Sequence, residues 1–310
     1  LFLFRSDRHR RRWQTQGPFL TGEEVNHATL DRRTGVLYAT ANSPWFGAHL
    51  AYSPDIGETW HDPKAGIGFS AKSGLKLERL WHIEPGRPSE PGVVYCGVDP
   101  AALFRSDDGG ETWQEVQGLS AHPSRQRWEP GAGGLCLHSI VLDPTNSSRM
   151  WVGISSVGTF RTDDGGKTWR PQNRGVRADF LPERYPEFGQ CVHHLVLAAD
   201  GNSRLYQQNH CGVYRSDDAG ETWQEVTSGL PSDFGFPMAA HPREPDTAYV
   251  IPLQGPEFRC PPQGKLRVYR TKDAGHTWQP LSRGLPQRGA YMGVYREALC
   301  TDSLEPVGVY

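Results

Sequence analysis

The sequence predicts an all-β fold, a β-propeller of four-stranded antiparallel blades, and three observations lead to this prediction. A turn motif recurs at a nearly constant spacing, and short apolar runs fill each interval. No interval contains the amphipathic pattern of roughly 10 to 15 residues that a helix would need. Four short strands per repeat, without helices between them, are typical of propeller blades around a central channel.

The recurring motif has the form Ser/Thr-x-Asp-x-Gly-x-Thr-Trp, and its complete copies begin 53, 56, 54 and 55 residues apart. The complete copies are Ser53–Trp60, Ser106–Trp113, Thr162–Trp169, Ser216–Trp223 and Thr271–Trp278. A degenerate copy, Ser6–Trp13, keeps only the serine and the tryptophan. A fixed spacing of this size indicates that each repeat is one supersecondary unit.

Each interval divides into four candidate strands, as the third complete repeat illustrates. An apolar run at 138–142 is expected to form the innermost strand, and Asp143-Pro144 marks the turn after it. Shorter runs at 150–153 and 158–161 precede the motif, and the fourth strand is expected at 168–170. β-branched and aromatic residues in these runs favour strands.

The motif itself is expected to have a structural role. Its aspartate can accept hydrogen bonds from backbone N–H groups of the turn, and its glycine can adopt a positive φ angle. Its tryptophan can pack between neighbouring sheets. These aspartates are therefore expected on a rim away from the ligand face, where they are poor catalytic candidates.

Both ends of the sequence fall within a repeat. Residues 1–6 match a third strand entering its turn motif, and residues 299–310 match a first strand and the start of a second. The chain as it stands is therefore predicted to be a single propeller domain, residues 1–310, with six blades, the last formed by both termini. A longer parent chain would give seven blades.

Composition limits the classes of partner. The formal net charge is −2, so no global positive potential would attract nucleic acid or an anionic membrane. No apolar run approaches the roughly 20 residues that span a bilayer. We expect a carbohydrate or a small anionic ligand as partner, with a protein or peptide as an alternative, and neither nucleic acid nor membrane.

Six cysteines lie far apart, and no two have the CxxC spacing. A domain of this size does not need disulfides for stability, so reduced thiols and a cytoplasmic location are the favoured interpretation. Secretion stays open, because the native N-terminus can lie upstream of Leu1.

The five complete motifs and the strand pattern resemble the sialidase-like superfamily of BNR, or Asp-box, repeat propellers, over essentially the whole chain. The superfamily includes sialidases, xyloglucan-cleaving glycosidases, sortilin-type receptor domains and photosystem assembly factors, so the resemblance implies either an enzyme or a binding scaffold. The Arg-Ile-Pro segment that carries the first sialidase arginine does not occur in this sequence. Its absence argues against sialidase activity, unless a longer parent chain supplies the segment.

Ligands are expected on the face where the long connectors between repeats converge, since long loops are often functional. These connectors are residues 60–80, 113–136, 169–191 and 278–299. Candidate ligand-binding residues within them are Arg79, Trp128, Arg177, Tyr185 and Arg296. A glycosidase needs two carboxylates. The candidate catalytic residues are Glu78, Glu129, Asp179 and Glu297, with Glu183 and Asp233 as further candidates.

Two neighbouring repeats share a Cys-x-His sequence at the start of the innermost strand. Cys136-Leu-His138 aligns with Cys191-Val-His193, and the alternation of a strand turns each cysteine and its histidine the same way. The same alignment places Asn26 and Arg79 at the His138 position of other repeats. His138, His193, His194 and His210 are therefore candidate ligand-binding residues near the channel.

Three interpretations of these histidines stay open. They can be polar groups that line a channel, or parts of a pocket that binds an anionic or sugar-like group and transfers protons. They can also bind a divalent metal through His138, His193 and His210, with a thiolate as a further ligand. Apart from this metal, no cofactor is predicted.

The function we favour is that of a carbohydrate-directed, glycoside-hydrolase-like protein that uses the loop-rich face at the channel. One alternative is a non-catalytic scaffold that binds a ligand or a protein. Another is a metal- or histidine-dependent enzyme. Whether the protein is an enzyme stays open.

Overall fold

The computed structural model describes residues 1–201 and 203–310. They fall into two compact units, Leu1–Ala121 and His122–Tyr310. The described residues form six antiparallel sheets and a single four-residue α-helix, so the predicted all-β class is confirmed. The single domain and the blade shared by both termini stay predictions. Among the described residues, no helix is long and apolar enough to cross a membrane.

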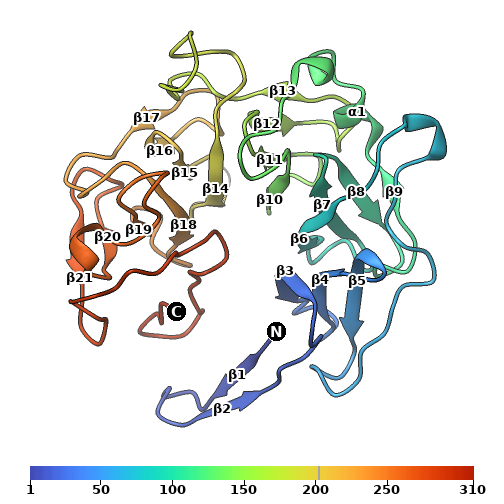
Figure 1. Ribbon diagram of the computed structural model, residues 1–310, viewed down its shortest axis with the longest axis horizontal. Coiled ribbons are helices and arrows are strands. Elements are labelled where there is room, and N and C mark those ends of the chain that lie inside the picture. Colours follow the sequence, from blue (N-terminus) through green and yellow to red (C-terminus); the bar gives the residue numbers. More distant parts are fainter. Residues whose placement is uncertain (202) are drawn as a thin grey trace. The chain divides into compact units, whose positions relative to one another are not determined.

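The first unit contains a two-stranded, a three-stranded and a four-stranded sheet, in the order β1-β2, β3-β4-β5 and β6-β7-β8-β9 (Figure 1). Its strands are β1 (Leu3–Ser6), β2 (Trp13–Gln16), β3 (Glu24–Leu30), β4 (Leu37–Ser43), β5 (Gly47–Ser53), β6 (Arg79–Pro85), β7 (Val94–Asp99), β8 (Leu103–Ser106) and β9 (Gln114–Glu115). A 3-10 helix, η1 (Ala71–Ser73), and the helix α1 (Gln117–Ser120) lie in its connectors.

The second unit contains three four-stranded sheets whose strands follow one another in chain order (Figure 1). Its strands are β10 (Leu137–Leu142), β11 (Met150–Ile154), β12 (Gly158–Thr162), β13 (Arg170–Pro171), β14 (Val192–Leu197), β15 (Leu205–Asn209), β16 (Gly212–Ser216), β17 (Gln224–Glu225), β18 (Gly235–Ala240), β19 (Ala248–Pro252), β20 (Val268–Thr271) and β21 (Gln279–Leu281). Two 3-10 helices, η2 (Arg125–Arg127) and η3 (Pro262–Gly264), lie in connectors.

The sheet β3-β4-β5 differs from the predicted blade because its fourth strand is reduced to one bridge, between Tyr52 and His61. Pro63 follows two residues later and has no N–H group with which to continue the pairing. The next amides turn to Glu111 instead, since Lys64 N–H donates to its carboxylate and Ala65 N–H to its backbone oxygen. The outer edge of this sheet is therefore open.

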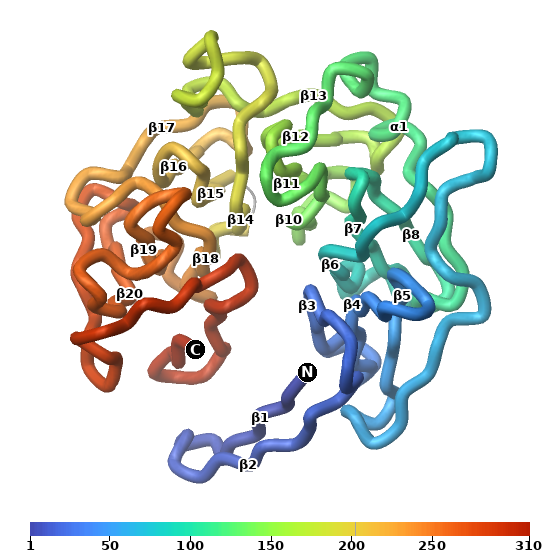
Figure 2. Tube along the Cα trace, viewed as in Figure 1, coloured from blue at the N-terminus to red at the C-terminus, as the bar shows by residue number. Residues whose placement is uncertain are grey.

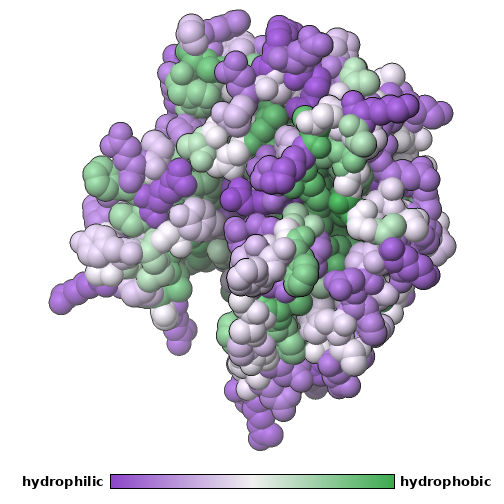
Figure 3. All heavy atoms as spheres, turned by 45° about the vertical axis from the view of Figure 1, so that its right-hand side comes forward, coloured by the Kyte–Doolittle hydropathy of each residue, from purple (hydrophilic) through white to green (hydrophobic). Residues whose placement is uncertain are grey.

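Apolar side chains from facing sheets form the core within each unit. In the second unit, Trp151, Val192 and Tyr214 belong to one buried cluster, and Tyr206, Met238 and Trp278 belong to another. The connector that precedes β14 is a long loop that extends away from the sheets (Figure 2). The face in Figure 3 is largely hydrophilic, with hydrophobic residues visible in patches between the polar ones.

All five complete motifs form the same hydrogen-bonded turn. In the third, the Thr162 hydroxyl donates to Asp164 Oδ1 at 2.8 Å and accepts the Gly166 N–H at 2.9 Å. Thr168 donates its N–H to Oδ1 at 2.9 Å and its hydroxyl to Oδ2 at 2.6 Å. The φ angle of Gly166 is 93°, which glycine adopts without strain. The structural role predicted for the motif is confirmed.

Candidate functional site

Each of the five innermost strands β3, β6, β10, β14 and β18 has a β-bulge near its beginning. In the first four of these strands the extra residues are Asn26, Trp81, His138 and His193. These four positions are structurally equivalent because each is the extra residue of its bulge. A bulge re-aims the side chain of that residue. The alignment from sequence was right for Asn26 and wrong for Arg79, which lies two residues before the bulge of β6.

Three of the bulge residues link their sheet to the next one. Asn26 Nδ2 donates to the Leu80 oxygen at 3.2 Å, His138 Nε2 to the Val192 oxygen at 2.8 Å, and His193 Nδ1 to the Gly235 oxygen at 2.6 Å. Each acceptor lies directly before the bulge of the following sheet. A carbonyl oxygen can only accept, so it fixes which nitrogen of each imidazole carries the proton.

Both ring nitrogens of His138 have partners. Nε2 donates to Val192, and Nδ1 lies 3.0 Å from the Ser139 hydroxyl. Burial lowers the pKa of His138 well below its usual value, and the positive charge of Arg296 lowers it further. The structure therefore places His138 as a neutral link between β10 and β14.

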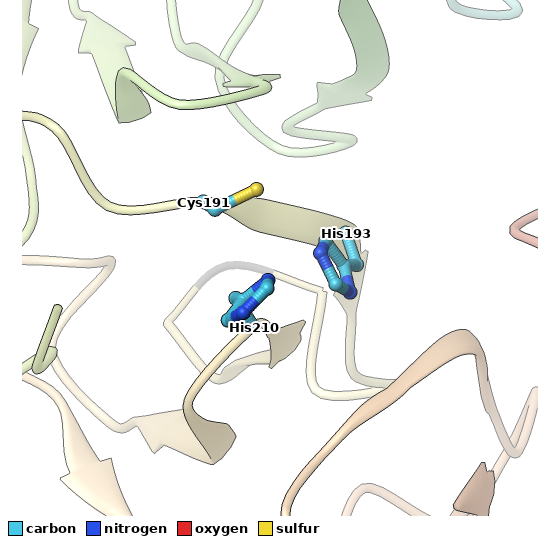
Figure 4. A group of neighbouring side chains, drawn as sticks. All are labelled: Cys191, His193 and His210. Atoms are coloured by element: carbon cyan, nitrogen blue, oxygen red, sulfur yellow. The ribbon is translucent and has the colours of Figure 1, made fainter. Parts of the chain in front are cut away.

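Cys191, His193 and His210 form a compact group at one end of the sheet β14-β17 (Figure 4). Cys191 directly precedes β14, and His193 is the second residue of that strand. His210 directly follows β15, and its N–H donates to the Cys191 oxygen at 2.9 Å. The thiol sulfur and one nitrogen from each imidazole all lie within 4.8 Å of one another. The predicted convergence of His193 and His210 thus occurs with Cys191 as the third member.

Aromatic rings hold the two imidazoles in place. His193 stacks on Phe236 with ring centroids 4.4 Å apart and meets the edge of Phe234 at 5.3 Å. His210 meets Phe180 at 5.2 Å and Phe234 at 5.1 Å. Burial is the main cause that lowers the pKa of both histidines, strongly in the case of His193.

His194 and Arg296 lie close to this group but engage other partners. His194 Nδ1 donates to the Arg296 backbone oxygen at 3.0 Å, and Arg296 Nη2 donates to the Ser155 hydroxyl at 3.1 Å. The Arg296 guanidinium also lies over the Phe236 ring, 5.5 Å from its centroid. The structure thus brings four of the predicted residues, His193, His194, His210 and Arg296, to one end of the second unit.

Arg177 forms the centre of a separate ionic network. Its guanidinium pairs with Asp233 at 2.9 Å, with Glu225 at 3.0 Å and with Asp179. Hydrogen bonding, first of all to Glu225, raises the pKa of Arg177. Asp179 and Asp233 are therefore bound to a guanidinium in this structure. Tyr185 lies nearby in the same connector, exposed, with Arg184 over its ring at 5.5 Å.

The other predicted residues lie elsewhere. Trp128 is buried, packs against Phe160 at 5.2 Å and donates its indole N–H to Ser124 at 2.8 Å, so its ring is not available as a surface platform. Glu129, Glu183 and Glu297 are exposed in connectors of the second unit. In the first unit, Glu78 pairs with Lys76 at 3.6 Å, and Arg79 lies 4.0 Å from both Glu24 and Asp99.

The first unit contains a cavity of about 540 Å³ that the sequence did not predict. It lies beside the edge of β5, where the fourth strand is missing. Its lining includes Phe46, Trp60, His49, Glu23 and Asp62. Two signals could have indicated it, namely the adjacent aromatic residues at 45–46 and the proline three residues after the first motif's tryptophan.

Glu23 and His49 face each other in this cavity, with 3.1 Å between Oε2 and Nε2. Phe46 is 89% exposed and its neighbour Trp45 is 86% exposed. Trp60 is half-buried and packs at a tilt against Phe19 at 5.9 Å. The cavity thus combines aromatic surface with two carboxylates and two imidazoles, those of His49 and His61, a mixture typical of small-molecule sites.

Comparison with known proteins agrees with the repeat pattern. Residues 104–115, 160–171 and 214–225 match the BNR/Asp-box repeat family. A xyloglucanase of Paenibacillus sp is 26% identical over 267 residues, covering 76% of this chain and 24% of that protein. A xyloglucanase of Acetivibrio thermocellus is 24% identical over 275 residues, covering 79% and 30%. The chain thus spans less than a third of these relatives.

Solved structures share the fold. An ancestral GH74 enzyme superposes with a TM-score of 0.65 at 16% identity, covering 91% of this chain and 33% of that one. A structure of YCF48 bound to D1 peptide gives a TM-score of 0.51 at 16% identity, covering 88% and 73%. The predicted propeller class and the resemblance to the BNR/Asp-box superfamily are therefore confirmed, and the chain is similar to glycoside-hydrolase-like propellers of this group.

Proposed function

We propose that the protein is carbohydrate-directed and that the cavity of the first unit binds a segment of a xyloglucan-type polysaccharide. The observation that carries this proposal is the combination of the exposed Phe46 ring and the half-buried Trp60 ring with carboxylate and imidazole groups around a cavity of about 540 Å³. That volume lies in the usual range of ligand pockets, roughly 300 to 1,000 Å³. The similarity to xyloglucanases supports the choice of polysaccharide.

The aromatic rings would supply the binding surface. Phe46 is almost fully exposed at the rim of the cavity, and Trp60 lines it. Covering an exposed aromatic ring with an apolar surface is favourable because both surfaces leave water. A pyranose ring presents C–H groups on its faces and can supply such a surface. The carboxylates of Glu23 and Asp62 can accept hydrogen bonds from sugar hydroxyl groups.

Hydrolysis is the finer part of this proposal. A glycosidase needs one carboxyl group as acid and a second as base or nucleophile. Glu23 and Asp62 are the two carboxylates that line the cavity, which makes them the first residues to test. Glu78, Glu129, Asp179 and Glu297 stay predictions from the sequence.

Binding can be tested by isothermal titration with xyloglucan oligosaccharides, and with mannan oligosaccharides for comparison. Phe46→Ala should weaken xyloglucan binding at least about tenfold, the equivalent of about 1.4 kcal/mol. Phe258→Ala is the matched control, since Phe258 is also exposed but lies in the second unit. Equal affinity of the wild type and Phe46→Ala, or no binding at all, would refute the proposed site.

Release of reducing sugar from xyloglucan tests the catalytic part separately. Glu23→Gln and Asp62→Asn should abolish release while keeping most of the binding. If the wild type binds xyloglucan but releases no sugar, the protein is a carbohydrate-binding module and the hydrolysis proposal fails.

A peptide-binding scaffold is the second candidate function. Tyr291, Phe258 and Tyr295 of the second unit are 77%, 63% and 53% exposed, and the fold is shared with YCF48 bound to a peptide. In that case Tyr291→Ala would lose binding to extended peptides, whereas Phe46→Ala would not. Fluorescence anisotropy with a labelled peptide library distinguishes the two candidates.

A further inference from the structure

We propose that Cys191, His193 and His210 bind a zinc ion through three protein ligands, with a fourth coordination position left for water or another ligand atom. The sulfur and the two ring nitrogens converge within 4.8 Å in the second unit. Thiolate and imidazole together are the ligands that Zn²⁺ prefers, and three protein ligands are typical of sites with an exchangeable position. This proposal does not depend on carbohydrate binding.

The backbone brings the three ligands together. The hydrogen bond from the His210 N–H to the Cys191 oxygen makes these residues cross-strand neighbours at the end of the β14-β15 hairpin. His193 is the bulge residue of β14, and its imidazole lies near the Cys191 thiol, while His210 approaches from the end of the neighbouring strand β15 (Figure 4). The ligands therefore come from a rigid hairpin and its immediate ends.

The orientation of His193 is the strongest support for a metal ligand. The Gly235 oxygen accepts the Nδ1 proton at 2.6 Å, so Nε2 carries a lone pair. Among residues 1–201 and 203–310, this Nε2 has no hydrogen-bond partner, although His193 is only 2% exposed. Metal-binding imidazoles commonly donate their other N–H to a carbonyl oxygen in this way, which fixes the tautomer and the ring orientation.

The other two ligands are similarly available. Within the described part of the chain, the ring nitrogens of His210 have no hydrogen-bond partner, and its ring is held by Phe180 and Phe234. Cys191 is a free thiol that is partly exposed, and its contact with the Ser156 hydroxyl is long, at 4.0 Å. His138, by contrast, uses both of its nitrogens in hydrogen bonds.

The spacing fits zinc after a small adjustment. Bond lengths of about 2.3 Å to sulfur and 2.0 to 2.1 Å to nitrogen in a tetrahedron give ligand separations of roughly 3.3 to 3.6 Å. The ligand atoms lie within 4.8 Å of one another, and rotation of the partly exposed Cys191 side chain is the adjustment that would bring its sulfur closer to the two imidazoles. His193 does not need to move, since its stacking on Phe236 already holds the ring.

The test uses the full chain after removal of metal with a chelator. Zn²⁺ is titrated by calorimetry, and Co²⁺ is followed by absorption because a cobalt-thiolate bond gives a charge-transfer band. We expect one equivalent of each metal and a band that Cys191→Ser abolishes. Cys191→Ser and His210→Ala should each weaken zinc binding at least about tenfold. The controls Cys300→Ser and His276→Ala, both at exposed positions, should bind as the wild type does.

A second measurement needs no substitution. Alkylation of each cysteine with iodoacetamide is followed by mass spectrometry with and without Zn²⁺. Zinc should slow the modification of Cys191 by tenfold or more and leave that of Cys300 unchanged. Zinc uptake that Cys191→Ser does not weaken, or equal alkylation of Cys191 with and without zinc, would overturn the proposal.

Discussion

At one end of the sheet β14-β17, Asp218 is surrounded by hydrogen-bond donors, whereas at the other end Cys191, His193 and His210 direct available lone pairs toward one another. Asp218 Oδ1 accepts from the Ser216 hydroxyl at 2.8 Å and from the Thr222 N–H at 2.9 Å, and Oδ2 accepts from the Thr222 hydroxyl at 2.6 Å. Within the described part of the chain, His193 has a hydrogen-bond partner on one ring nitrogen only.

Hydrogen-bond saturation indicates where chemistry can occur in this repetitive fold. The polar groups of the Asp box satisfy one another within eight residues, and the turn recurs in all five complete copies. Cys191, His193 and His210 are brought together across a hairpin, and within residues 1–201 and 203–310 their lone pairs are not all used in hydrogen bonds. The types of residue do not distinguish the two ends, because both are rich in polar side chains. The two ends differ in how completely these side chains are hydrogen-bonded.

The largest expected effect is at the structural end. Trp223→Ala should lower the free energy of unfolding by about 3 to 5 kcal/mol, because it empties a buried site and removes the indole hydrogen bond to the Gln172 oxygen at 2.8 Å. Urea unfolding followed by circular dichroism measures the change. Trp45→Ala, at an exposed position, is the control and should be nearly neutral. A loss below about 1 kcal/mol for Trp223→Ala would contradict the packing role of the Asp-box tryptophan.

His138 should behave as a structural histidine. His138→Ala should destabilise the protein by about 2 to 4 kcal/mol, since it leaves a cavity and removes the partner of the buried Val192 oxygen. Zinc stoichiometry should stay at one equivalent. Thermal unfolding and zinc titration of the same variant check both parts, and a folded His138→Ala protein that no longer binds zinc would place His138 among the ligands.

A smaller effect is expected from the Asp-box hydroxyl. Ser216→Ala should cost about 1 to 3 kcal/mol, because the Gly220 N–H, 2.8 Å from the Ser216 oxygen, would be buried without an acceptor. Ser282→Ala, in an exposed turn, is the matched control. Indistinguishable stabilities of the two variants in urea would show that the hydroxyl is dispensable.

The smallest effect per residue should appear at acid pH. Hydrogen bonds, first of all from the threonine hydroxyl, lower the pKa of Asp55, Asp164 and Asp273 to about 2. A carboxyl whose pKa is lower in the folded state stabilises the fold above its unfolded pKa, near 4. That contribution is lost as the pH falls from about 4 toward 2. Unfolding midpoints across this range should fall less steeply for Asp164→Asn than for the wild type.

Much of the fold was predictable because its signals are local. The Asp box satisfies its hydrogen bonds within eight residues, so each copy specifies its own turn, and the spacing of the copies specifies the sheets. The bulges were not predictable in the same way. Alignment placed Asn26 correctly but chose Arg79 in place of Trp81, since nothing in the local sequence of β6 marks the residue that is left unpaired.

The all-β class and the turns follow from the local sequence, because strand alternation and turn chemistry act over a few residues. The tertiary structure decided which histidine joins the cysteine. His138 donates to the Val192 oxygen 54 positions away, while His210 meets Cys191 across a hairpin.

The tertiary structure also decided the cavity beside β5, since the chain after Pro63 pairs with Glu111 instead of completing the sheet. These hydrogen-bond partners come from segments far apart in the chain. The local sequence is compatible with several such partners, and packing of the folded chain selects one of them.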